Sequence, residues 1–357
     1  MGHFSVRQAT RHRYRGAVPE PARARITAVA AHLPARYRTM DEIREKIAKS
    51  GAYTPPPGLL EDLTGVRGVH VRGDGENASD LAVAAARKAL DEAGLRIDDI
   101  DLLLFAATAA DLIEPATSHL VAAKMGATCP VFDVKNACNS VLNAMETAAS
   151  FIETGRYRAV LIVCGEAGSL VTRWNVPDRQ ALLRALPGYT ASDAGAAMVL
   201  TAGPAGEDSP GIMAMRFVSN SAAWNACTVS GGGTMHQRSV HDDHTTLRLN
   251  GDLRQGLLDV LPAILAVASD ELAAARTGAF VAFHQIAMPQ YRQMLDAFSL
   301  PESLCMPAVA EHGNCAAASL PLQLVKAREA DRVEDGDVMA MIGVASGFSF
   351  GLALVRW

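Results

Sequence analysis

The chain has 357 residues, of which 49% are hydrophobic and 20% are charged, and its formal net charge is −5. These proportions are typical of a folded globular protein and exclude a disordered chain. The acidic balance argues against a nucleic-acid-binding protein. No apolar run reaches the roughly 20 residues of a membrane span, and the first residues lack the apolar segment of a secretory signal. We therefore expect a cytoplasmic protein that is not bound to membranes.

The six cysteines stand singly, with no C-x-x-C pair and no metal-type pairing with histidine. This spacing predicts free thiols in a reducing compartment rather than a disulfide framework or a zinc site. His236, His241 and His244 match no helical pair, and the neighbouring aspartates favour a solvated loop over a metal site. No strand is followed by G-x-G-x-x-G, and there is no G-x-x-x-x-G-K-[ST]. We expect neither a metal nor a nucleotide cofactor.

Residues 1–23 are rich in Arg, His, Pro and Ala and have no apolar period, so they are expected to form a disordered basic arm. An α/β pattern follows. In its first half, strands are predicted over 25–33, 100–107, 130–134, 158–164 and 195–201, and helices over 41–49, 77–93, 116–125 and from position 138 onward. The nearly all-apolar run 100–107 is typical of a central strand that is covered on both faces.

The Gly/Pro-rich stretch 202–211 is the best boundary, which predicts two halves over 24–203 and 211–357. In the second half, strands are predicted over 212–218, 279–283, 338–344 and 352–357, and helices over 259–273, 290–298 and from position 314 onward.

The two halves repeat one order of elements: strand, helix, a loop that opens an Ala-rich helix, strand, strand. Cys138 opens this helix in the first half and Asn314 opens it in the second. His284 ends the strand before Asn314, and Thr108 ends the equivalent strand of the first half. If a pseudo-twofold axis relates the halves, Cys138 and Asn314 meet at two helix N-termini with His284 beside them.

A cysteine at a helix N-terminus is favoured as the thiolate, because unpaired backbone N–H groups and the positive dipole end lie there. A thiolate at Cys138 can attack a thioester while His284 and Asn314 supply N–H donors and backbone N–H groups stabilise the oxyanion. Each residue also has a structural interpretation: a buried thiol, a satisfied histidine and a helix cap. Their repeat-related positions favour the active-site interpretation.

Six segments carry a resemblance to a known family: LTGVRGVH at 63–70, DVKNAC ending at Cys138, SDAGAAMVL at 192–200, FHQ around His284, GNCAAASLP around Asn314 and GVASGFSFG around Ser346. From about residue 25 to 357 the chain resembles the thiolase superfamily, in particular the β-ketoacyl synthase III branch. The resemblance implies two pseudo-symmetric α/β halves in a five-layered α-β-α-β-α core. It also implies a catalytic triad of Cys138, His284 and Asn314 and an oxyanion hole made by the backbone N–H groups of Cys138 and Ser346.

Two departures from the family pattern bear on the substrates. A tryptophan that stacks on the adenine of coenzyme A in fatty-acid-initiating members is Leu59 here. The segments DLIEPATSHL, which contains Glu114, and CGE resemble the olefin-pathway thiolases that join two acyl thioesters head to head. In those enzymes the glutamate matching Glu114 enters the partner subunit's site and removes the α-proton of the second acyl chain. A helix-start glutamate before Pro115 is the structural alternative.

The resemblance implies an acyltransferase of fatty acid or polyketide biosynthesis. It loads an acyl group on Cys138 and then forms a carbon–carbon bond to a second thioester by Claisen condensation. Non-decarboxylative head-to-head condensation is the leading interpretation. Decarboxylative condensation with a malonyl carrier protein and acyl transfer to an alcohol or amine remain alternatives. Acyl-CoA or acyl-carrier-protein thioesters are the expected substrates, and a homodimer, or a heterodimer with a related subunit, is the expected assembly.

Overall fold

The computed structural model describes residues 22–237 and 239–357. Most of the predicted arm lies outside the described residues. Ala22 and Arg23 already belong to strand β1 (Ala22–His32), where they pair with Pro204 and Gly203. The strand therefore begins earlier than its apolar pattern predicted, because hydrogen bonding to the neighbouring strand extends past the apolar residues.

The first sheet has five strands in the order β1-β7-β6-β4-β5. Besides β1 they are β4 (Leu102–Ala106), β5 (Val131–Val134), β6 (Ala159–Ala167) and β7 (Asp193–Pro204). β4 runs parallel to β5 and β6, whereas β7 is antiparallel to β6 and β1. Every residue of β4 is buried, which confirms the prediction of a central strand covered on both faces.

The second sheet has four strands in the order β11-β12-β13-β8. They are β8 (Gly211–Ser219), β11 (Phe280–Phe283), β12 (Val338–Ala345) and β13 (Ser349–Arg356). The order β8-β13-β12-β11 repeats the order β1-β7-β6-β4 with the same pattern of parallel and antiparallel pairs. This topology confirms the internal repeat, with β5 left as an edge strand of the first sheet.

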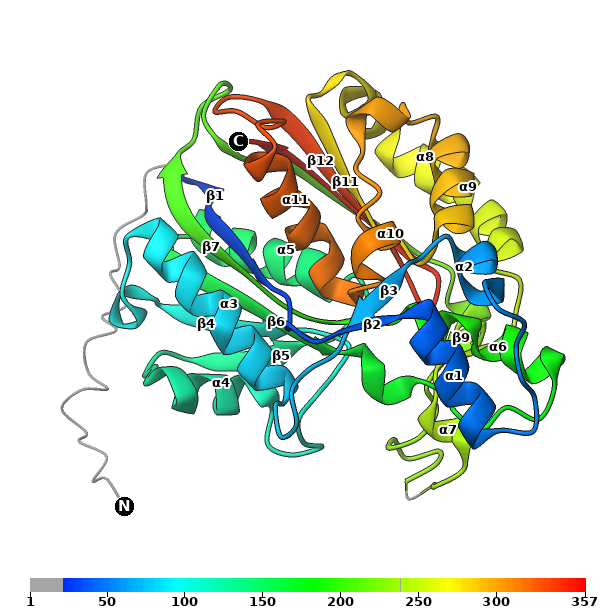
Figure 1. Cartoon of the computed structure of the whole chain (residues 1–357). Helices are drawn as coiled ribbons and strands as arrows, with labels where there is room; N and C mark the ends of the chain where they lie inside the picture. Colours follow the sequence, from blue (N-terminus) through cyan, green and yellow to red (C-terminus); the bar gives the residue numbers. More distant parts are fainter. Residues whose placement is uncertain (1–21, 238) are drawn as a thin grey trace, which may run out of the picture.

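The helices complete five layers (Figure 1). Two central helices, α5 (Ser140–Glu153) and α11 (Ser319–Glu329), contact strands of both sheets. The outer helices are α3 (Ala78–Ala93) and α4 (Thr117–Met125) on the first sheet and α8 (Leu253–Thr277) and α9 (Met288–Phe298) on the second. Alanines fill much of the core around α5 and the first sheet, and their small side chains allow these layers to pack closely. The expected α-β-α-β-α architecture is confirmed.

Smaller elements surround one end of the two sheets. They are α1 (Met40–Ser50), α2 (Leu59–Thr64), α6 (Arg179–Thr190), α7 (Asp242–Thr245), α10 (Val309–His312) and the short strands β2 (Tyr37–Thr39), β3 (Gly68–His70), β9 (Cys227–Thr228) and β10 (Arg248–Leu249). Helices α1, α2 and α6 share a separate apolar cluster. None of the helices in the described part of the chain combines the length and the apolar composition that a membrane-spanning helix needs.

Candidate active site

Residues of both halves line one cavity of about 950 Å³. Thr108 and Cys138 come from the first half, and His284, Asn314 and Ser346 come from the second. The volume lies at the upper end of the range of about 300–1,000 Å³ that small-molecule pockets span. The structure thus brings four of the five predicted site residues into one cavity.

Cys138 lies in a tight turn between β5 and α5. The helix begins at Ser140, so Cys138 stands just before the helix and does not open it as predicted. Ala137 has a left-handed backbone with φ 47°, which is uncommon for a residue with a side chain. Ser140 Oγ donates to the Ala137 carbonyl at 2.7 Å, and Asn139 Nδ2 donates to the Ser349 carbonyl at 2.9 Å. The turn is therefore held by groups from both halves.

Strand β12 approaches this turn closely because it carries a glycine there. A Cβ atom at Gly343 would lie 2.0 Å from Asn139 Oδ1, far inside van der Waals contact. Any other residue would push the second half away from the Cys138 turn. Gly343 therefore contributes to the geometry of the cavity although it does not line it.

His284 directly follows β11, as predicted, and its backbone N–H donates to the Ile342 carbonyl at 2.8 Å. Its side chain is 3% exposed, and neither ring nitrogen has a hydrogen-bond partner among the described residues. Burial lowers the pKa of His284 to about 4, so the imidazole is neutral at pH 7. A neutral ring with unpartnered nitrogens can accept a proton from a group in the cavity.

Asn314 lies in the turn before α11, which begins only at Ser319. Its Oδ1 accepts a hydrogen bond from the Ala316 N–H at 2.9 Å, and its backbone bonds to Thr190 and Ser192. These contacts fix the orientation of the side-chain amide. They do not use the Nδ2 donors, which suit a ligand that carries negative charge.

The expectation that Cys138 is already a thiolate is wrong. Burial is the largest cause that raises the pKa of this thiol, and the electrostatic effects of Glu166 and then Cys227 raise it further. The backbone N–H of Cys138 lowers the pKa, but its effect is smaller than the other three. Cys138 keeps some solvent contact through the cavity, but the surrounding protein outweighs the favourable backbone N–H. In the free protein the thiol is therefore protonated at neutral pH, and it needs a base such as His284.

Glu166 at the end of β6 is a buried carboxyl group behind the cavity, with 1% exposure. It accepts hydrogen bonds from the N–H and the hydroxyl of Thr108 and, at 3.3 Å, from the N–H of Ala317 in the second half. Burial raises the pKa of Glu166 to about 7. Glu166 was not predicted to have a role, although an acidic residue near the end of an otherwise apolar strand is a signal that could have identified it.

Glu166→Gln should make Cys138 react faster with iodoacetamide, because the amide removes a charge that opposes the thiolate. One unit below the Glu166 pKa of about 7 the carboxyl is mostly neutral, so variant and wild type should react alike. One pH unit above the Glu166 pKa, the thiolate fraction of the variant should exceed that of the wild type by about tenfold for each unit by which the substitution lowers the thiol pKa. Peptide mass spectrometry across pH measures this ratio. Exposed Glu153→Gln is the matched control, and a ratio that does not change with pH would contradict the prediction.

Glu114, the fifth predicted residue, does not reach the cavity of its own chain. It is exposed at the tip of the loop between β4 and α4, next to Leu112 and Ile113, which are 49% and 86% exposed. The base of this loop is held by Asp111, whose carboxylate accepts from the Ser79 N–H at 3.2 Å. An apolar tip on a fixed base is typical of a contact with another protein surface.

Ser346 lies in the turn between β12 and β13, on the cavity wall. Its hydroxyl donates to the carbonyl of Cys227, so the backbone N–H is the group that remains for a ligand. Cys227 places a second thiol in the same wall, which the sequence analysis did not single out. All six cysteines have free thiols, as predicted.

The rest of the cavity wall is mostly apolar, which suits a hydrocarbon chain. The apolar residues that line it include Val171, Leu247, Leu253, Leu257, Leu258, Ile286, Met294, Ala297 and Phe348.

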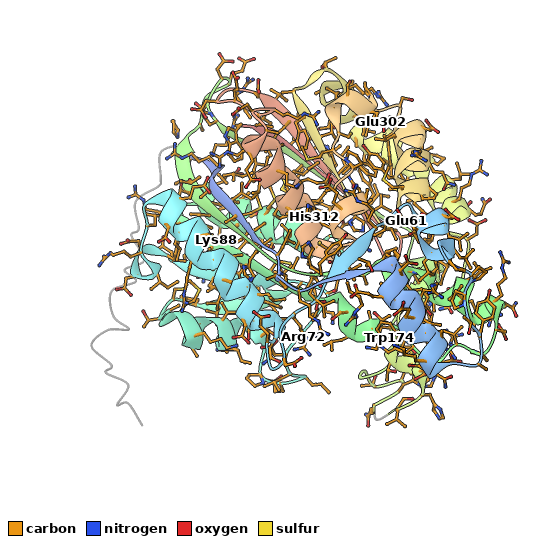
Figure 2. The ribbon with its side chains drawn as sticks, in the orientation of Figure 1. Glu61, Arg72, Lys88, Trp174, Glu302 and His312 are labelled. Carbon is orange, nitrogen blue, oxygen red and sulfur yellow. The ribbon has the colours of Figure 1, made fainter. Side chains whose placement is uncertain are left out.

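Leu59, at the position of the adenine-stacking tryptophan, shares an apolar cluster with Tyr53 and Trp174. Leu59 packs against the apolar cluster of α1, α2 and α6. Trp174 lies beside α1 (Figure 2), but Lys46 Nζ is 3.9 Å and the Arg38 guanidinium 5.3 Å from its ring centroid. Both contacts are cation–π contacts, in which a positive group lies over an aromatic ring.

The predicted solvated loop contains a histidine stack rather than a metal-ligand cluster. The rings of His236 and His244 lie 3.9 Å apart, and His244 Nδ1 is 2.6 Å from Ser239 Oγ. Within residues 22–237 and 239–357, no group of three His, Cys, Asp or Glu side chains is arranged to hold a metal ion.

Two family models match the chain. The model described as 3-oxoacyl-[acyl-carrier-protein (ACP)] synthase III matches residues 132–221, and its C-terminal counterpart matches 275–357. A β-ketoacyl-[acyl-carrier-protein] synthase III of Rhodospirillum centenum is 30% identical over 341 residues, which are 94% of this chain and 100% of the relative. The chain belongs to the 3-oxoacyl-ACP synthase III family. The matched regions of this synthase III family member contain Cys138, His284, Asn314 and Ser346.

Further relatives of this synthase III family member come from Xanthomonas campestris. An acyl-CoA:acyl-CoA alkyltransferase is 32% identical over 345 residues, covering 92% of this chain and 97% of the relative. A solved OleA structure matches with a TM-score of 0.81 and 26% identity, covering 96% of this chain and 100% of that chain. The predicted thiolase fold is confirmed, and the protein is a condensing enzyme of the acyltransferase type.

Proposed function

We propose that the enzyme joins two acyl thioesters head to head, without loss of carbon dioxide, through an acyl group carried on Cys138. The observation that carries this proposal is a single, mostly apolar cavity lined by Cys138, His284 and Asn314. The unpartnered ring of His284 lies in the same wall as a thiol that cannot ionise alone at neutral pH. This combination suits transfer of an acyl group to the thiol.

In the loading step, His284 takes the proton of the Cys138 thiol as Sγ attacks the carbonyl carbon of the first thioester. The backbone N–H groups of Cys138 and Ser346 stabilise the oxyanion of the tetrahedral intermediate. The intermediate collapses to an acyl-Cys138 thioester. The leaving thiolate of coenzyme A, or of a phosphopantetheine arm, takes the proton from His284.

In the condensation step, the α-carbon of a second thioester loses a proton to a base and attacks the carbonyl carbon of acyl-Cys138. His284 and the Asn314 amide supply N–H donors to the enolate oxygen. The carbon–sulfur bond to Cys138 then breaks, the thiol is regenerated by protonation, and a β-ketoacyl thioester leaves. The groups named here and the substrates' own thioesters supply every step, so the proposal requires no separate cofactor.

The base in this proposal is Glu114 of the partner subunit. The loop tip that carries Glu114 is exposed, apolar and adjacent to the edge strand β5, where Phe132 is 38% exposed. An edge strand with apolar neighbours can pair with a second copy of the sheet, and a two-fold dimer would send each tip toward the other subunit. In that position the carboxylate would lie beside the second acyl chain, as a base that removes its α-proton must.

The named relatives support both forms of condensation. The Xanthomonas campestris acyl-CoA:acyl-CoA alkyltransferase favours two acyl-CoA substrates, and Leu59 does not exclude coenzyme A held in another way. The Rhodospirillum centenum synthase favours the alternative, decarboxylative condensation with a malonyl carrier protein. In that reaction the loss of carbon dioxide creates the carbon nucleophile, so no base is needed at the α-carbon.

Glu114→Gln should retain acylation of Cys138 but lose condensation of two simple acyl-CoAs by about 10²–10⁴-fold, the usual contribution of a general base. The nearly isosteric amide keeps the loop's shape. Product formation is measured for wild type and variant with two acyl-CoAs, and separately with acyl-CoA plus malonyl carrier protein. With the malonyl donor, any activity should not depend on Glu114.

Glu207→Gln, an exposed substitution between β7 and β8, is the matched control for the change of charge. Light scattering establishes that both variants remain dimers. A wild type that accepts only the malonyl donor, together with an unimpaired Glu114→Gln variant, would end the head-to-head proposal. A protein that is a monomer at micromolar concentration would remove the proposed source of the base.

A further inference from the structure

One glycine in helix α8 lies where a side chain would collide with the cavity wall. A Cβ atom at Gly256 would lie 2.1 Å from Cζ, 2.4 Å from Cε1 and 2.5 Å from Cε2 of Phe348. Glycine is a poorer helix former than alanine, and Gly256 is buried in the first part of α8. The contact with the Phe348 ring supplies a reason for a glycine at this position.

The contact between Gly256 and Phe348 lies at the cavity wall, although Gly256 itself does not line the cavity. Phe348 lines it, as do Leu253 and Leu257 on either side of Gly256 along α8. The ring of Phe348 therefore lies between the helix backbone and the space where we place an acyl chain. Without a side chain at position 256, the ring can lie flat against the helix.

The backbone of Phe348 cannot easily move away. Its φ angle is 47°, it follows Gly347 with φ 82°, and its carbonyl accepts from the Asn220 N–H at 2.9 Å. The next residue, Ser349, accepts hydrogen bonds from the side-chain amide of Asn139, the residue that follows Cys138. A side chain added at position 256 would therefore displace the Phe348 ring, and the cavity is the open space next to it.

We propose that the Gly256–Phe348 contact sets which acyl chains the enzyme accepts, because the bare helix surface at Gly256 keeps the Phe348 ring out of the acyl channel. The ring would otherwise fill part of the space that a longer acyl chain needs, so the contact acts on the length of the chain that can be loaded. The proposal rests on the acyl-thioester function given above, and it concerns only the loading of Cys138.

Gly256→Ala should lower the efficiency of Cys138 loading with a long-chain acyl-CoA by at least about tenfold relative to acetyl-CoA, since small changes in an apolar pocket discriminate by about 10–200-fold. The double variant Gly256→Ala/Phe348→Leu should restore most of the long-chain loading, because the smaller side chain removes the collision. Intact-protein mass spectrometry measures the rate of acyl-enzyme formation, and circular dichroism checks that each variant is folded.

An unchanged ratio of long-chain to acetyl loading in Gly256→Ala would overturn the proposal. So would an equal loss of both substrates that the second substitution does not restore. If Gly256→Ala does not fold, Phe348→Leu alone decides: it should raise loading of the bulkiest chains relative to acetyl, and no change would refute the role of the ring. A wild type that loads no acyl-CoA contradicts the acyl-thioester function itself, whereas a wild type that loads with an unaltered ratio in the variants contradicts only the present inference.

Discussion

Cys138→Ala should abolish acyl loading, with a loss of about 10⁴-fold or more, as is usual when a covalent nucleophile is removed. Cys138 lies in the turn before α5, in the wall of the cavity that His284 and Asn314 also line. The strained backbone of this turn lies at the neighbouring Ala137, so the substitution at position 138 does not change the strained residue. The measurement is intact-protein mass spectrometry after incubation with a panel of acyl-CoA and acyl-carrier-protein thioesters.

Cys129→Ala is the matched control, because Cys129 is a partly buried thiol outside the cavity lining. Its labelling should equal that of the wild type. Labelling of the Cys138→Ala variant that maps to Cys164, Cys227 or Cys315 would refute the assignment of the nucleophile.

His284→Ala should lower both loading and condensation, by about 10²–10⁴-fold each. From the sequence, an ionised Cys138 would need His284 mainly for condensation. The structure changes this expectation, because burial keeps the thiol protonated and His284 must accept its proton. Asn314→Ala, in contrast, should impair condensation more than loading, because its amide donors serve the enolate.

The pH dependence of single-turnover loading tests this division of roles. In the wild type, loading should fall as pH drops toward the His284 pKa of about 4, because the protonated ring can no longer accept a proton. In His284→Ala, loading should instead increase with pH across the neutral and alkaline range as the thiol ionises unaided. Loading by His284→Ala at the wild-type rate at neutral pH would show that Cys138 ionises without a base.

The repeated order of elements predicted much of this fold. Apolar runs and helix-stop signals are local features, and the repeated order of elements around Cys138 and Asn314 indicated which elements of the two halves correspond. The strand orders β1-β7-β6-β4 and β8-β13-β12-β11 bear out that correspondence. Local sequence also predicted His284 at the end of a strand. Four of the five predicted site residues line one cavity in the structure.

What the sequence could not provide depends on distant segments. Helix α6 was not predicted, because Pro187 and Gly188 ordinarily end helices, yet both are buried within it. The raised pKa of the Cys138 thiol comes from burial and from Glu166, which belongs to strand β6. The close contact between Gly256 and the ring of Phe348 joins segments that are far apart in the sequence, so no local pattern predicts it.

The central claim is that the acyl group on Cys138 is transferred to the α-carbon of a second thioester. The most direct test isolates the acyl-Cys138 enzyme free of substrate and mixes it with a second acyl-CoA in a single turnover. We expect loss of the acyl group from Cys138 together with formation of one equivalent of a β-ketoacyl thioester, without release of carbon dioxide. Transfer of the acyl group to water, an alcohol or an amine, or a carbon–carbon bond formed only from a malonyl donor, would contradict it.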